Sequence, residues 1–150
     1  MKFTPASINK FILFKIPIAW IAGIRVTEIS NEKCIIMLRH KWINQNPFRS
    51  IYFGVLVMAG ELSTGIPLFR EVQKSGGQIS MLVIRHESFF YKKATGKIKF
   101  IFDETHLIKK HLQTAIESKQ PVTFELIARA YNEEDTEIGK FVYEWSVKAK

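Results

Sequence analysis

The chain has 150 residues, of which 47% are apolar and 13% aromatic, so it can bury a substantial core and is not a disordered chain. It has no run of about 18 uninterrupted apolar residues, which argues against a membrane-spanning helix. The net charge of +8 fits nucleic acid, anionic lipid or phosphorylated small molecules, and fits a solvated basic face without a partner equally well.

The N-terminal segment predicts an amphipathic helix over residues 4–16. Thr4 or Ser7 can cap its start, and Pro17 marks its end because proline disfavours continuation of a helix. Polar residues interrupt the apolar part of this segment, so we predict that it is not a cleaved signal sequence.

Two strands and a long apolar helix follow. Residues 21–29 and 33–41 have strand composition, and the polar turn between them predicts a hairpin. After a polar loop, residues 52–72 are too long and too evenly apolar for a strand, which predicts a helix enclosed by other elements. Pro67 is expected to bend this helix or break its last turns, and Gly76 and Gly77 to end the element.

The second half of the chain predicts four strands and one short helix. Alternating apolar residues indicate strands with one buried face, and a turn at 94–96 is expected to join the first two strands directly. The predicted strands cover residues 79–92, 97–102, 121–131 and 137–148, and the short helix reaches from about 105 to 117.

The order of elements predicts one α+β domain over residues 1–150, built on an antiparallel six-stranded sheet. Such a sheet needs a cover for its apolar face, and residues 52–72 form the only predicted element that is apolar enough. A sheet wrapped around one long central helix is a hot-dog fold, and this is the predicted fold class.

One acid within the apolar helix raises a chemical question. Residues 44–65 read NQNPFRSIYFGVLVMAGELSTG, and Glu61 is the only charged side chain in the apolar part. Burial of an unpaired carboxylate costs several kcal/mol or more, so Glu61 is neutralised, paired with a cation, or in use. A structural pair with arginine or lysine is the alternative to a catalytic role.

The same stretch resembles the hot-dog acyl-CoA thioesterase superfamily, in particular its phenylacetyl-CoA thioesterase-like branch. In that branch a loop Asn is followed six residues later by His-Gly-Gly at the helix start, and the catalytic acid comes nine residues after the His. Asn46, Tyr52-Phe53-Gly54 and Glu61 fall at these spacings. Tyr52 replaces the family His and Phe53 replaces the first Gly, so the contact that the His makes with the thioester is missing here.

The resemblance implies catalytic roles for several of these residues. Glu61 would act as general base on water or as nucleophile, and the amides of Phe53 and Gly54 at the helix start would hold the developing oxyanion. Asn46 would orient the water or the acid, and Thr64, one helical turn after Glu61, could hydrogen-bond the acid.

The spacing along the helix implies a homodimer. Phe53 and Glu61 are eight residues apart, which is roughly 12 Å at 1.5 Å per residue, so one carbonyl cannot easily touch both within one chain. In the family the amide comes from one subunit and the acid from the other, in a dimer or a dimer of dimers.

Substrate contacts are expected from Tyr52, Arg49 and Ser80, with Ser80 also a candidate hydrogen-bond partner of the acid. Coenzyme A, as part of an acyl-CoA substrate, carries phosphates that basic side chains would bind. The alternative is that these basic side chains are only solvent-exposed surface residues without a ligand. The candidate phosphate ligands are Arg49, Arg85, Lys92, Lys93, Lys97 and Lys99.

The remaining expectations are absences and a location. The four histidines lack metal-ligand spacing, so we predict no metal site and no cofactor beyond the coenzyme A of the substrate. A nucleic-acid partner rests on charge alone and is not predicted. The single Cys34 suits a reducing cytoplasm. The alternative to a thioesterase is a non-catalytic hot-dog protein that binds acyl-CoA or another apolar ligand.

Overall fold

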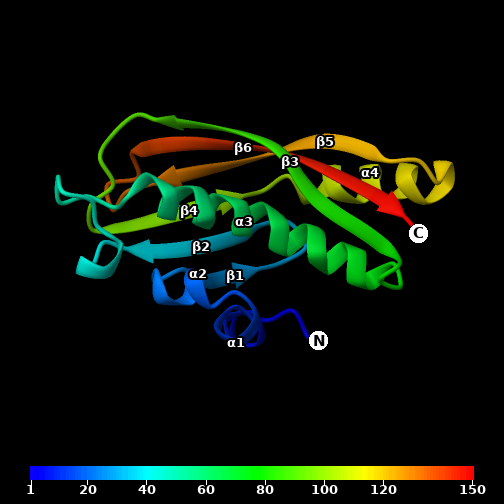
Figure 1. Ribbon diagram of the computed structural model, residues 1–150, viewed down its shortest axis with the longest axis horizontal. Helices are drawn as coiled ribbons and strands as arrows, with labels where there is room; N and C mark the ends of the chain where they lie inside the picture. Colours follow the sequence, from blue (N-terminus) through cyan, green and yellow to red (C-terminus); the bar gives the residue numbers. More distant parts are fainter.

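A single antiparallel sheet carries all six strands in the computed structural model, which describes residues 1–150 (Figure 1). The strand order is β1-β2-β4-β5-β6-β3. The strands are β1 Arg25–Ile29, β2 Cys34–Arg39, β3 Ile79–Phe90, β4 Lys97–Phe102, β5 Val122–Tyr131 and β6 Glu137–Ala149. The helices are α1 Pro5–Lys15, α2 Pro17–Ile21, the short 3-10 helix η1 Trp42–Asn44, α3 Phe53–Lys74 and α4 Thr105–Ser118.

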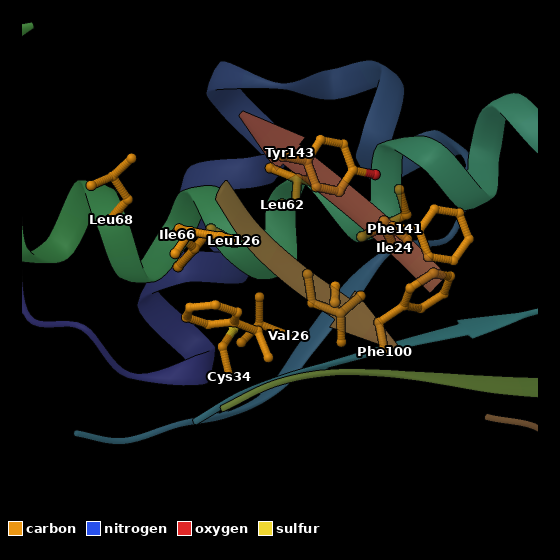
Figure 2. Packing of buried hydrophobic residues seen from close by; sticks show 14 of the residues in the cluster. Ile24, Val26, Cys34, Leu62, Ile66, Leu68, Phe100, Leu126, Phe141 and Tyr143 are labelled. Atoms are coloured by element: carbon orange, nitrogen blue, oxygen red, sulfur yellow. The ribbon is translucent and has the colours of Figure 1, made fainter. Parts of the chain in front are cut away.

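Helix α3 lies across one face of the sheet and forms the centre of the core (Figure 1). Figure 2 shows Leu62 and Ile66 of α3 among side chains from the strands, including Leu126 and Phe141. The alternation in β5 and β6 turns every second residue toward α3, as expected for a sheet with one covered face. The predicted α+β hot-dog fold is confirmed.

The N-terminal segment differs from the prediction after its first helix. Thr4 caps α1 in a capping box with Ser7, as expected. Pro17, however, does not end the helical region but starts the short helix α2, and β1 begins only at Arg25. Proline suits the first position of a helix because that residue needs no hydrogen-bonded N–H.

Of the two effects predicted for Pro67, a bend or a break in the last turns, the break does not occur. Helix α3 continues through Pro67 to Lys74, with Ile66 and Leu68 buried beside it. Packing on both sides of the proline outweighs the one missing backbone hydrogen bond. The helix ends as predicted, because Gly76 and Gly77 follow with φ angles of +94° and +72°.

Strands β3 and β4 do not form the hairpin that their sequence order suggested. Strand β3 pairs only with β6, whereas β4 lies between β2 and β5. Strand β3 is therefore an edge of the sheet, and a register shift between Val83 and Arg85 changes which of its residues face α3.

The single cysteine lies deep in the core. Cys34 is fully buried at the start of β2, and burial raises the pKa of its thiol to about 12 even though Arg70 acts in the opposite direction. None of the helices combines the length and the apolar character that crossing a membrane requires.

Candidate functional site

Glu61 lies on α3, half-buried and without a partner. Its carboxylate makes no hydrogen bond and no ion pair. Burial raises the pKa of Glu61 to about 7, from an ordinary value near 4.5. Glu61 therefore does not form the structural ion pair that was the alternative to a catalytic role. With a pKa of about 7, its side chain can both take up and release a proton near neutral pH.

A small apolar cavity of about 200 Å³ opens beside Glu61. Helix α3 contributes most of its wall, and Met81 of β3 together with the N-terminal segment supplies the rest. The side chains around it, other than Glu61, carry no charge. The lining residues are Phe11, Ile16, Glu61, Leu62, Gly65, Ile66, Phe69 and Met81.

Strand β6 supports the turn of α3 that carries Glu61. The Tyr143 hydroxyl, which points toward α3 in Figure 2, donates a hydrogen bond of 2.6 Å to the Val57 carbonyl. Burial raises the pKa of Tyr143 well above its usual range, and the nearby Glu61 adds to this shift. The sequence showed Tyr143 only as one of several alternating strand residues, so its contact with this helical turn could not be found from spacing.

The expected hydrogen bond from Thr64 to the Glu61 carboxylate is not formed. The Thr64 hydroxyl instead donates to the main-chain carbonyl of Glu61 at 3.0 Å and accepts a 3.1 Å bond from the Trp145 indole N–H. Thr64 is fully buried and ties β6 to the helix. It supports the position of Glu61 without touching its carboxylate.

The first amides of α3 are free, as the oxyanion role requires. The N–H groups of Phe53 and Gly54 have no acceptor in the protein, and no side chain caps the helix start. The first turn contains no acidic residue, so the partial positive charge of the helix end is not neutralised.

Asn46 organises the loop that leads to this helix start. Its side-chain oxygen accepts hydrogen bonds from the Phe48 and Ser50 amides at 2.9 and 3.3 Å, and its amide group donates to the Ser50 hydroxyl at 2.9 Å. Asn46 also lines the cavity at the helix start, a cavity to which Glu61 does not belong. Within one chain Asn46 is thus placed with the amides and not with the acid.

This second cavity, of about 540 Å³, is wider and strongly aromatic. Tyr52 and Phe53 are 50% and 55% exposed at its wall, and their rings meet edge to face with centroids 4.9 Å apart. Lys92 and Lys93 also line it, so two of the predicted phosphate ligands lie at this cavity. Its aromatic side chains are Phe48, Tyr52, Phe53, Phe90 and Tyr91.

Other predicted ligands lie elsewhere. Ser80 is exposed on the sheet face turned away from α3 and donates to the Lys148 carbonyl at 3.3 Å, so it cannot reach Glu61 of its own chain. Arg85 pairs with the carboxylates of Glu87, Glu125 and Glu144 and lines neither cavity. Arg49 is exposed, with a φ of +58°, and lines neither cavity.

The last two predicted phosphate ligands belong to β4. Lys97, at the start of β4, lines two further cavities together with Arg39 at the end of β2, and Lys99 Nζ lies 3.6 Å from the Asp135 carboxylate. No group of three or more His, Cys, Asp or Glu side chains could hold a metal ion.

The site residues therefore form two clusters within one chain. One contains the free amides of Phe53 and Gly54 with Asn46 and the aromatic cavity. The other contains Glu61 and the small apolar cavity, eight residues or roughly 12 Å further along α3. The two cavities share no residue.

Comparison with known proteins gives a family and a fold. The sequence profile of the family described as domain of unknown function DUF4442 matches residues 4–147. No curated protein sequence matches the chain.

Several solved structures are similar over nearly the whole chain. A protein of unknown function from Chlorobaculum tepidum TLS has a TM-score of 0.81 at 18% identity, covering 98% of each chain. A protein from Pseudomonas aeruginosa, named as a probable thioesterase, has a TM-score of 0.78 at 14% identity, covering 98% of this chain and 97% of that one. A thioesterase from Haemophilus influenzae has a TM-score of 0.69 at 12% identity, covering 99% and 93%. At these identities the likeness establishes the fold.

Proposed function

The chain belongs to the DUF4442 family, and on the geometry of α3 we propose that it is a thioesterase that hydrolyses acyl-CoA without a metal ion. The observation that carries the proposal is the unpaired, half-buried carboxylate of Glu61 beside an apolar cavity, with its pKa raised to about 7. The similar structures named as thioesterases support it.

The proposed reaction needs only groups of the protein and water. Glu61 takes a proton from water as the water oxygen bonds to the thioester carbon, and the carbonyl electrons move to the oxygen held by the Phe53 and Gly54 amides. The C–S bond then breaks, and the departing thiolate takes up the proton from Glu61. In the second route the carboxylate itself attacks the thioester carbon and the C–S bond breaks, which gives an anhydride of Glu61 and a thiolate that takes a proton from solvent. Water then hydrolyses the anhydride.

The proposal includes a homodimer, because amides and acid of one chain are too far apart to share one carbonyl. The free edge of β3 supports it. This edge is twelve residues long, and Leu82, Ile84 and Phe89 on this strand are exposed apolar side chains. An unprotected edge of that kind is a common surface for pairing with another chain.

Coenzyme A would occupy the aromatic cavity at the helix start. Lys92 and Lys93 offer positive charge to its phosphates, and the exposed rings of Tyr52 and Phe53 offer surfaces for its adenine or for the pantetheine arm. The reducing cytoplasm is the location that fits an unpaired buried Cys34.

The second candidate is a non-catalytic protein that binds acyl-CoA. The observation in its favour is the bulk at the helix start, where Phe53 narrows the space next to its own amide and Tyr52 stands at the family His position. In that case both cavities bind ligand and Glu61 releases no thiol.

Thiol release from a panel of acyl-CoAs tests the two candidates. Glu61→Gln is expected to lower kcat/KM by about 10²- to 10⁴-fold because the proton acceptor is lost. Glu134→Gln, in an exposed turn, is the matched control and should be unchanged. Equal release by wild type and Glu61→Gln would contradict the proposal, and tight binding without release would favour the second candidate.

The helix start permits an equally specific test of the oxyanion donors. Proline is well tolerated at the first helical position, so Phe53→Pro removes the N–H while the helix is kept. We expect about 10²- to 10³-fold lower kcat, whereas Phe53→Ala keeps the amide and most of the rate.

Mixing two inactive variants tests the shared site. A heterodimer of Glu61→Gln and Phe53→Pro subunits has one complete site, so a re-equilibrated equal mixture should recover about a quarter of wild-type activity. No recovery in a mixture shown to contain heterodimers would place both groups of each site in one chain.

A further inference from the structure

Three residues of α3 shape the cavity beside Glu61. Glu61, Gly65 and Phe69 follow one another at intervals of four, so they lie on one side of the helix over roughly 12 Å. The resulting strip has an acid at one end, no side chain in the middle and an aromatic ring at the other end. All three line the cavity.

Gly65 keeps the middle of this strip open. A methyl group there would lie 3.0 Å from a carboxylate oxygen of Glu61 and 3.1 Å from the Trp145 ring. The absence of a side chain therefore leaves room both for the carboxylate and for a chain that passes beside it.

The N-terminal helix closes the far end of the cavity. The Phe11 ring stacks on Phe69 with centroids 5.7 Å apart, and Phe3 meets Phe69 edge to face at 6.0 Å. Ile16, directly after α1, and Met81 of β3 complete the wall. A ligand that extends from Glu61 along α3 thus meets an aromatic barrier that α1 helps to build.

We infer that this cavity holds the acyl group of the substrate and that Phe69 with Phe11 limits its length. The inference rests on the proposed function. An apolar cavity of about 150 Å³ is large enough for benzene, so one of about 200 Å³ takes a phenyl-sized group or a chain of about six to eight carbons. The substrates selected are medium-chain or small arylacyl thioesters, and long chains are excluded.

The test is the dependence of kcat/KM on acyl length from two to sixteen carbons. In wild type, each buried methylene should raise kcat/KM about fourfold until the cavity is full, and kcat/KM should fall for chains longer than about eight carbons, which the cavity excludes. Phe69→Ala or Phe11→Ala should move the optimum to longer chains by about two to four carbons, since each opens the barrier. Met81→Trp should move it to shorter chains.

Phe14→Ala is the matched control, because Phe14 lies on the same helix, is 69% exposed and does not line the cavity. Thermal unfolding of each variant separates a changed preference from a loss of folding. The inference is wrong if the optimum is the same in wild type, Phe69→Ala and Met81→Trp while all three hydrolyse their substrates. That result would leave the proposed function intact.

Binding of acyl-CoA thioether analogues gives a second readout that needs no hydrolysis. Length-dependent affinity that shifts in Phe69→Ala would support the inference even in a protein that releases no thiol, and would then contradict only the proposed function. Affinity that is independent of chain length would overturn the inference.

Discussion

Helix α3 carries two shielded carboxylates that differ in their surroundings. Glu71 is 7% exposed, and its Oε1 lies 3.0 Å from Arg70 Nε and 3.1 Å from Lys74 Nζ. Arg70 in turn donates to the Ser30 carbonyl at 2.5 Å. Ten residues earlier on the same helix, Glu61 has no cation and faces a cavity.

In the proposed reaction, this difference separates a structural acid, Glu71, from the reacting acid, Glu61. The charge of a paired carboxylate is compensated by its partners, and removal of Glu71 would leave the buried Arg70 guanidinium without that compensation. An unpaired carboxylate in an apolar setting has a raised pKa, because burial disfavours its charged form. Burial of the unpaired acid lowers the free energy of unfolding. In the proposed reaction the same burial gives Glu61 a pKa near neutral pH, which suits a general base.

Of the substitutions that test the difference between the two acids, the one at Glu71 should have the largest effect on the free energy of unfolding. Glu71→Gln leaves the buried Arg70 guanidinium without its carboxylate, so we expect a loss of about 3 to 5 kcal/mol in the free energy of unfolding. Urea unfolding measures it, and thiol release per folded molecule should be retained. The double variant Arg70→Met, Glu71→Met should recover much of the loss, and failure to do so would mean that the pair has a role beyond charge compensation.

The second prediction concerns the pH dependence of stability. The pKa of Glu61 is about 7 in the folded protein and near 4.5 ordinarily, so the folded state binds the proton more tightly. The stability that this protonation contributes is fully present below about pH 4.5 and is lost as pH rises through about 7. Relative to Glu61→Gln, wild type should lose about 2 to 3 kcal/mol over this range. Parallel stability curves for the two proteins would contradict the raised pKa.

The third prediction concerns the pH dependence of activity. Only ionised Glu61 can act as base or nucleophile, so kcat/KM should rise about tenfold per pH unit below about pH 7 and level off above it. A plateau that begins near pH 4.5 would show that the reacting group is an ordinary carboxylate.

The smallest effect on stability is expected at Gly65. Gly65→Ala gains helix propensity but brings a methyl group to 3.0 Å from the Glu61 carboxylate and 3.1 Å from the buried Trp145 ring. The two effects oppose each other, so we expect a net stability loss of about 1 kcal/mol while kcat falls about tenfold. Gly60→Ala is the comparison, because its methyl would lie 2.6 Å from the Tyr143 hydroxyl oxygen and should cost about 1 to 3 kcal/mol. If Gly65→Ala and Gly60→Ala lost the same amount of activity and the same amount of stability, the space beside Glu61 would have no special role.

Much of the fold could be predicted from local patterns. Strand composition with a polar turn located β1 and β2, alternation located the four later strands, and the long apolar run located α3 with its acid. Pairing could not be predicted in the same way, because the partners of β3 and β4 depend on contacts distant in sequence. The side of the sheet that Ser80 faces depends on register, and a shift of one residue reverses it.

The candidate site shows the same division. The contrast between the two acids is visible in the sequence, since Lys74 follows Glu71 by one helical turn and no cation lies within four residues of Glu61. The contacts of Phe11 and Tyr143 with this part of α3 come from elements about 50 and 80 residues away. No spacing rule connects them to Glu61.

The burial of Cys34 has a practical consequence for assays that detect released thiol with a chromogenic thiol reagent. A sulfhydryl that is enclosed by hydrocarbon and stays protonated reacts with such reagents only when the chain opens, so the native protein contributes no background signal. The same reagent, added without substrate, then counts molecules that have lost their structure. One chromophore can thus report turnover and unfolding in the same cuvette.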